Sequence, residues 1–364
     1  MEIEKIYSAG RLSEVKEHYE EWWEHKNTRP LAGVAVKCRQ PDLRQPKFPL
    51  LCQANCNDMR MTVDDILDAI EYEVCSYEYY GDAFPVFSLD CFGPGIIAAI
   101  LGAELDNSTG NVWFHAKEVL EPEQLKFELD ESNPWFLRLK SIMEKSVERF
   151  EGKILLSMPD MSGILDLLAV FRPGEHLLLD LYDDPEEVQR LSRELYDVWM
   201  KLYRKFAGYL NMDEFGYTDW SSLLSKKPSY IIQEDFCYMI GQDMFEEFVY
   251  PNLQKFCEDI DRTIYHLDGP GELKHLPKIL ELDQLRAVQW IPGAGNPSIE
   301  NYREIHRSIE STGKYIELPV YEPDQMLQVA GYVDNPACLH TMMIRCTAKE
   351  KKKYLYYLRE QGVI

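Results

Sequence analysis

Short apolar runs alternate along the chain with longer segments whose apolar residues recur at helical spacing. The runs are continuous and rich in aliphatic or aromatic residues, which is typical of buried strands. Eight such runs are Leu31–Lys37, Phe84–Leu89, Ile154–Met158, Phe215–Thr218, Thr263–Leu267, Ala287–Ile291, Tyr315–Leu318 and Thr341–Arg345. Eight strands that alternate with helices predict an α/β protein, and specifically a (β/α)8 TIM barrel.

The segments between the runs carry amphipathic helical patterns. One pattern spans Val63 to Tyr80, and another includes Phe245 and Phe256. Carboxylates around Pro185 suit the first turn of a helix, which we expect to continue to about Tyr209. We interpret the apolar stripes as faces that pack on the core.

Two stretches interrupt the alternation of runs and helical segments. Residues 40–61 contain three prolines, and residues 102–134 combine acidic turns with a hairpin signal at 107–110. Insertions of this kind in a barrel usually cap one end or cover the site. Because no repeat or interdomain linker is evident, we expect a single distorted barrel domain over residues 1–364, with loop elaborations and an N-terminal helical extension over about residues 1–30.

Composition limits the classes of binding partner that we expect and indicates the cellular compartment. Sixty-two acidic residues against 39 basic ones leave a formal charge of -23, which disfavours nucleic acid and anionic lipid as partners. Charged residues occupy the start of the chain where a signal peptide needs an apolar core, and no apolar run is long enough to span a membrane. The nine cysteines, an odd number, fit reduced thiols. These features predict a cytoplasmic protein.

The C-terminal ends of the expected strands should meet at one mouth of the barrel, where active sites of this fold lie. The residues at these ends are Arg39, Asp90, Cys91, Met158, Asp160, Asp219, Trp220, His266, Asp268, Trp290, Glu317, Tyr321 and Cys346. Acids and aromatics dominate the set, and Arg39 is its only basic member. Such a mouth favours a metal ion, a neutral aromatic or a cationic substrate over a polycarboxylate.

One of these strand ends carries two side chains that can bind a metal ion or transfer a proton. They are His266 and Asp268, just before the turn Gly269–Gly271. Residues two apart on a strand share a face, so the pair can supply two metal ligands, or a histidine whose tautomer a carboxylate fixes. The alternative is a core histidine followed by an ordinary turn aspartate. A third ligand would come from a neighbouring strand end, for which Glu317 and Cys346 are the candidates.

A family resemblance rests on several stretches that occur in a particular order. They are Leu179–Tyr182 with Pro185–Val188, Gln233–Met239 with Met244–Phe248 and Pro251, His266–Gly269, and Gly293–Asn296. Together they resemble the uroporphyrinogen decarboxylase superfamily over roughly residues 85–320. The resemblance implies a distorted (β/α)8 barrel with its site at the C-terminal mouth, in agreement with the strand count.

The superfamily contains two chemistries, and this sequence departs from the first. True decarboxylases carry an Arg-Gln-Ala-Gly-Arg motif that grips carboxylates, together with an aspartate near the end of an early strand. Here residues 39–42 read Arg-Gln-Pro-Asp, and Asp90 is shifted relative to the family aspartate. In the cobalamin-dependent methyltransferase branch, a His-x-Cys pair and a later cysteine bind zinc. His266-x-Asp268 occupies the place of that pair, with aspartate instead of cysteine.

The resemblance to this branch implies an enzyme that moves a methyl group between a small molecule and a separate corrinoid protein, assisted by zinc. His266 and Asp268 would then be the catalytic pair and metal ligands, with Glu317 and Cys346 as further candidate ligands. The residues expected to bind substrate are Asp90, Asp235, Trp290, Tyr321 and Arg39. A carboxy-lyase and a non-catalytic barrel that binds a small ligand or a corrinoid partner remain as alternatives, and a homodimer is common in such families.

Overall fold

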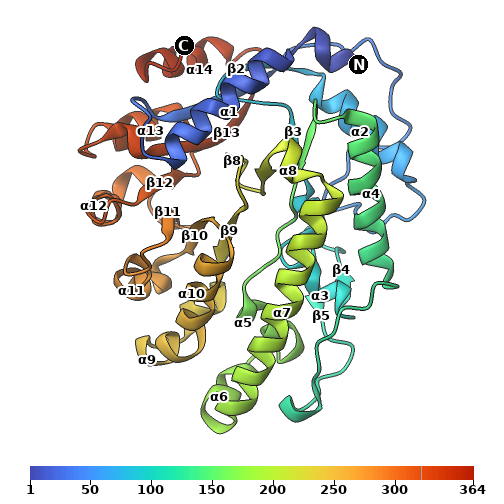
Figure 1. Cartoon of the computed structure of the whole chain (residues 1–364), viewed down its shortest axis with the longest axis vertical. Helices are drawn as coiled ribbons and strands as arrows, with labels where there is room; N and C mark the ends of the chain where they lie inside the picture. The colour runs from blue at the N-terminus through green and yellow to red at the C-terminus, as the bar shows by residue number, and fades with distance from the viewer. Residues whose placement is uncertain (321) are drawn as a thin grey trace.

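A computed structural model of the chain describes residues 1–320 and 322–364. Helices surround a central sheet, and the long helix α7 runs along one side of the molecule (Figure 1). The strands are β1 (Leu31–Lys37), β2 (Tyr77–Gly81), β3 (Val86–Ser88), β4 (Glu104–Asp106), β5 (Trp113–His115), β6 (Leu155–Ser157), β7 (Tyr217–Thr218), β8 (Leu224–Ser225), β9 (Ser229–Gln233), β10 (Arg262–Asp268), β11 (Leu285–Ile291), β12 (Tyr315–Leu318) and β13 (Leu339–Thr347).

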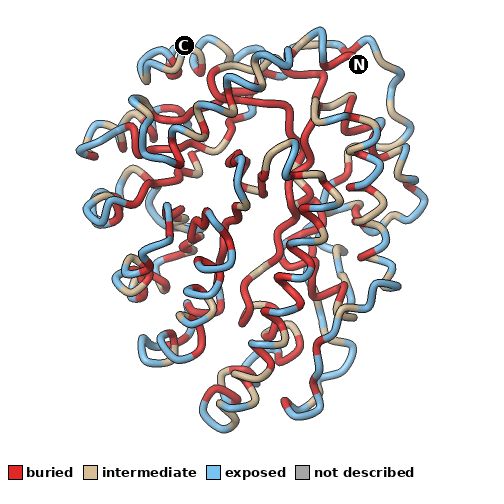
Figure 2. Tube along the Cα trace, in the orientation of Figure 1, coloured by how far each residue is buried: buried red, intermediate tan, exposed pale blue. Residues whose placement is uncertain are grey.

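The α-helices pack their apolar faces on these strands. They are α1 (Ala9–Trp23), α2 (Val63–Val74), α3 (Ile96–Ile100), α4 (Pro134–Phe150), α5 (Ile164–Phe171), α6 (His176–Asp183), α7 (Pro185–Tyr209), α8 (Met212–Phe215), α9 (Gln242–Met244), α10 (Tyr250–Asp259), α11 (Leu276–Leu280), α12 (Arg303–Ser311), α13 (Pro323–Ala330) and α14 (Lys351–Glu360). Burial follows the strands and the inner helix faces, while the outer helix faces are exposed (Figure 2).

The largest sheet has seven strands in the order β2-β1-β13-β12-β11-β10-β9. Its neighbours pair in parallel except for β1 and β2, which are antiparallel. β3 and β6 form a separate parallel pair, and the Met158 amide next to β6 donates to the Thr218 carbonyl of β7 at 2.9 Å. This mixed α/β arrangement, with a mostly parallel sheet and helices between strands, is consistent with the predicted TIM-barrel-like fold.

Three elements differ from the sequence-based expectation. The helix expected over Val63–Tyr80 ends at Val74, and the residues from Tyr77 onward form β2 and pair with β1 instead. The pattern also missed β9, whose five residues are all buried but include the polar Ser229 and Gln233 at its ends. By contrast, the run Phe215–Thr218 contributes only the two-residue strand β7.

The two insertions meet each other beside the sheet. The predicted hairpin forms as β4 and β5, and its turn residue Asn107 exchanges side-chain hydrogen bonds with Asn57 of the first insertion, at 2.8 and 3.1 Å. The Asn107 amide group also donates to the Gln53 carbonyl at 2.9 Å. These contacts fix the first insertion, which has no helix or strand of its own over 38–61. None of the helices in the described ranges has both the length and the apolarity needed to cross a bilayer.

Candidate functional site

The candidate site lies where two neighbouring strands of the large sheet end. β10 carries His266 and Asp268 on one face, since alternate strand residues share a face. The chain leaves β9 at Gln233 and turns at once into the short 3-10 helix η4 (Asp235–Met239). β9 and β10 pair in parallel with Gln233 opposite His266, so the turn brings Asp235 beside the end of β10.

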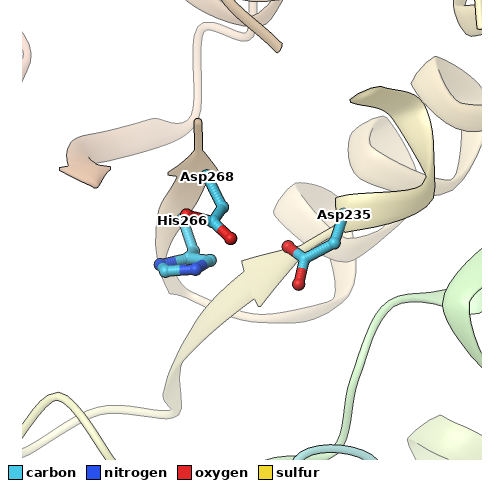
Figure 3. A group of neighbouring side chains, drawn as sticks. All are labelled: Asp235, His266 and Asp268. Atoms are coloured by element: carbon cyan, nitrogen blue, oxygen red, sulfur yellow. The ribbon is translucent and has the colours of Figure 1, made fainter. Parts of the chain in front are cut away.

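Asp235, His266 and Asp268 form a compact group at this edge of the sheet. Figure 3 shows Asp235 facing the pair on β10 from the neighbouring segment. One side-chain ligand atom of each residue lies within 4.8 Å of those of the other two. Asp235 is exposed, whereas His266 and Asp268 are half-buried, so the group is open to solvent on the Asp235 side. An imidazole and two carboxylates are donors that divalent metal ions accept.

A buried glutamine on the next strand orients His266. The two residues are paired across β10 and β11, and the His266 Nδ1 lies 2.5 Å from the Gln289 Oε1. The Gln289 amide nitrogen instead approaches the Met342 sulfur at 3.5 Å, which leaves the carbonyl oxygen for the histidine. Because a carbonyl only accepts, Nδ1 carries the proton and Nε2 keeps its lone pair for a ligand. The Trp220 ring packs edge-on against the imidazole, with centroids 5.2 Å apart.

The polar row continues across the sheet beyond Gln289. Glu317 on β12 pairs with Gln289, and His340 on β13 pairs with Glu317. All three are fully or almost fully buried, and the Glu317 Oε1 lies 3.4 Å from the His340 Nδ1. Glu317 is therefore one strand further from His266 than Gln289 is, and it acts on the imidazole only through its charge. Within the described ranges, the compact group of potential ligands contains neither Glu317 nor Cys346.

Two further carboxylates hold the loop that carries Asp235. Asp166 accepts the backbone N–H groups of Asp235 at 3.0 Å and of Phe236 at 2.6 Å. The buried Glu234 accepts the first two N–H groups of α5, those of Ile164 at 2.7 Å and Leu165 at 3.0 Å. These bonds satisfy backbone donors that would otherwise lack partners at the starts of α5 and η4. They tie the Asp235 loop to the start of α5.

Desolvation, together with the crowding of acids, determines the protonation of the site. The surrounding protein desolvates the Asp235 carboxyl group, and this desolvation, followed by the Asp268 charge, raises the pKa of Asp235 to about 7. Burial raises the pKa of Glu272, which follows the Gly269–Gly271 turn, to about 10, and nearby carboxylates including Asp235 add to the effect. Burial lowers the pKa of His266, although Gln289 and the nearby acids oppose the shift. At neutral pH the imidazole is therefore neutral, and Asp235 is poised to lose a proton.

Three residues that the sequence placed at the mouth lie in other surroundings. Trp290 is fully buried on the face of β11 opposite Gln289, where it packs edge-on against Tyr302 at 5.2 Å. Arg39 follows the end of β1, where its backbone N–H donates to the Ser76 carbonyl at 3.0 Å. Burial raises the pKa of the Cys346 thiol to about 11, and the charge of Glu350, just before α14, adds to the effect. Strand ends alone did not reveal which face each side chain occupies.

Asp90 and Tyr321 complete the predicted set. Asp90 lines a pocket at the same end of the sheet, and burial raises its pKa. Tyr321 lies outside the described residues. Sequence reasoning missed Gln289, Asp166 and Glu234, although a polar residue inside the apolar run of β11 was a usable signal for Gln289.

Comparisons with known proteins establish the fold of this chain. No protein-family model matches it, and no curated protein sequence matches it either. Among solved structures, it is similar to a methyltransferase from Methanosarcina mazei, with a TM-score of 0.64 over 96% of this chain and 99% of that chain. The two sequences are 10% identical, so the shared feature is the architecture.

Proposed function

We propose that this protein is a methyltransferase that moves a methyl group between a small molecule and a corrinoid carried by a partner protein, with a divalent metal ion held by Asp235, His266 and Asp268. The observation that carries the proposal is the compact group of one imidazole and two carboxylates at the open end of the sheet. The methyltransferase from Methanosarcina mazei supports it, because that protein shares the fold over nearly the full length of both chains. The resemblance of His266-x-Asp268 to the zinc-binding pair of the methyltransferase branch supports it independently of the fold.

The residues present fit a metal ion in number, type and access. Three protein ligands with one side open to solvent are typical of catalytic zinc sites, which keep a position for substrate. Two carboxylates balance the charge of a divalent ion, whereas without an ion the Asp268 charge adds to the effect of desolvation, and both raise the pKa of Asp235. Zinc is the ion that the family resemblance implies. When bound, it would act as a Lewis acid on the heteroatom that carries the methyl group.

The protein residues then have separate tasks. Gln289 holds the His266 Nδ1–H, which leaves the lone pair of Nε2 free for a metal ion. Asp166 and Glu234 hold the Asp235 loop through backbone N–H groups. The pKa of Asp235 is about 7, and its carboxyl group must be deprotonated to serve as a ligand. Metal binding near or below pH 7 would therefore release a proton from Asp235. Asp268 replaces the family cysteine, so a bound ion would have a carboxylate ligand where relatives have a more electron-rich thiolate. The ion would therefore be a stronger Lewis acid.

Metal analysis and methyl transfer test the proposal together. We expect the purified protein to bind one zinc ion per chain and to methylate free cob(I)alamin from one of a panel of methyl ethers, methylamines and methyl thioethers. His266→Ala should lose both properties. His115→Ala is the matched control, because His115 is exposed on the hairpin that contains β5. This variant should retain both zinc binding and methyl transfer. Zinc binding and transfer that survive in His266→Ala, or a wild-type protein that binds no added zinc, would contradict the proposal.

A further inference from the structure

A hollow lies at the same end of the sheet as the candidate metal group, over different strands. It has a volume of about 320 Å³ and is bounded by β1, β2, β3 and β13, together with the first insertion at Leu50–Gln53. In Figure 1, β2, β3 and β13 are labelled in the upper part of the molecule. None of the three candidate metal ligands lines this hollow. We call it the Arg345 pocket.

Arg345 is the only basic residue among the fifteen that line the pocket. Its guanidinium donates from Nη2 to the Val86 carbonyl at 3.3 Å, which holds the group across the space between β13 and β3. Within the described part of the chain, Arg345 has no carboxylate partner. Glu73 of α2, an acid that lines the pocket, is already engaged by Lys37 at 2.7 Å and by the Tyr77 hydroxyl at 2.8 Å. Arg345 therefore presents N–H groups that no protein acid uses.

The rest of the lining is largely aromatic and apolar, and part of it is held rigidly. Tyr77, Tyr79 and Phe87 contribute rings, and the Tyr79 hydroxyl is tied to the Val74 carbonyl at 2.8 Å. The Gln53 side chain accepts from the Val112 backbone N–H at 3.0 Å, which joins this wall to the hairpin insertion. A preformed, mostly apolar cavity with a few fixed polar groups is the usual form of a small-molecule site.

We propose that the Arg345 pocket binds a small monocarboxylate with a planar, apolar body. The arginine fork accepts a carboxylate through paired hydrogen bonds, and the ring faces of the wall cover the body. Asp90, which also lines the pocket, disfavours a second negative charge on the ligand. In a chain with a formal charge of -23, an unpaired arginine in a hollow supplies the local attraction that an anion requires. The inference goes beyond the methyl-transfer proposal, because it needs neither the metal ion nor His266.

Calorimetric titration of the metal-free protein with benzoate tests the pocket, with benzamide as the neutral analogue of the same shape. We expect benzoate to bind and benzamide not to bind. Arg345→Met should weaken benzoate binding about tenfold or more, since hydrogen bonds to charged groups contribute about 1.5–3 kcal/mol. Arg359→Met is the matched control, because Arg359 is exposed on α14 and lies outside the pocket. His266→Ala should bind benzoate like the wild type, which separates this proposal from the metal site.

Thiol alkylation locates the bound ligand. Cys52 and Cys38 are both exposed, but only Cys52 lines the pocket. Benzoate should slow the reaction of iodoacetamide with Cys52, read by peptide mass spectrometry, and should leave Cys38 unaffected. Equal benzoate affinity in wild type and Arg345→Met, no binding at millimolar benzoate, or equal protection of the two cysteines would overturn the proposal.

Discussion

Replacing Gln289 by leucine tests whether the orientation of His266 governs the candidate metal site. The change preserves most of the volume of a fully buried side chain but removes the acceptor that lies 2.5 Å from the His266 Nδ1. A neutral hydrogen bond contributes about 0.5–1.5 kcal/mol net, and a buried donor left without a partner costs about 1–3 kcal/mol. Loss of an outer partner of a metal-ligating histidine weakens metal binding about 10- to 100-fold, or about 1.4–2.7 kcal/mol. The cost of the unpartnered donor and the expected loss of metal affinity therefore overlap in magnitude.

Two measurements on Gln289→Leu follow from this reasoning. Zinc affinity, measured by competition with a chromophoric chelator, should fall about 10- to 100-fold. In the metal-free protein, long-range ¹H–¹⁵N NMR spectra of labelled histidines should show a protonated Nδ1 for His266 in the wild type and a loss of that preference in the variant. Gln284→Leu, at an exposed position just before β11, should change neither result. Unchanged zinc affinity and an unchanged tautomer in Gln289→Leu would refute the reasoning.

Two other predictions concern packing beside the site and the pH dependence of stability. In Gly271→Ala the new methyl carbon would lie 2.4 Å from the Tyr238 ring, so we expect the η4 loop to shift and zinc affinity to fall. The control is Gly241→Ala, whose methyl carbon would meet nothing within 4 Å. This variant should bind zinc normally in the same competition assay. Burial lowers the pKa of His306 to about 4, against about 6.5 in an unfolded chain. Between these pH values the unfolded state therefore binds more protons than the folded state. The contribution of His306 to the free energy of unfolding should fall by about 3 kcal/mol as the pH drops from 6.5 to 4. Urea titrations should show a shallower pH dependence for His306→Phe and an unaltered one for His115→Phe, and equal slopes for His306→Phe and the wild type would contradict this.

The alternation of apolar runs predicted most of the strands because buried parallel strands leave a strong local signal. Residues 263–267, 287–291 and 315–318 all fall within strands of the large sheet. The strand β9 escaped notice because polar Ser229 and Gln233 interrupt its apolar pattern, although pairing with β10 buries both. Such burial depends on a neighbour that lies about thirty residues away in sequence, which a local pattern does not contain.

The site was predictable only where spacing along one strand determines geometry. His266 and Asp268 share a face for that reason, and their proximity followed directly from the sequence. Asp235 joins them through the pairing of β9 with β10, and Gln289 meets His266 through the register of β10 with β11. Trp290 must lie on the opposite face from its neighbour Gln289, but only the pairing of Gln289 with His266 determines which of the two meets the site.

The two proposed sites divide the open end of the sheet by charge. Around the end of β10, Asp235 and Asp268 offer negative charge with a neutral imidazole, which favours a cation and repels an anionic ligand. Over β1 and β13, the unpaired guanidinium of Arg345 offers the opposite potential in a separate hollow. A substrate with a carboxylate at one end is therefore excluded from the carboxylate group unless a metal ion first neutralises it. Metal-free protein should consequently bind a monocarboxylate only through Arg345, and added zinc should create a second binding event that Asp268→Asn abolishes in calorimetry. A single event that depends on both residues at once would show instead that the two regions form one site.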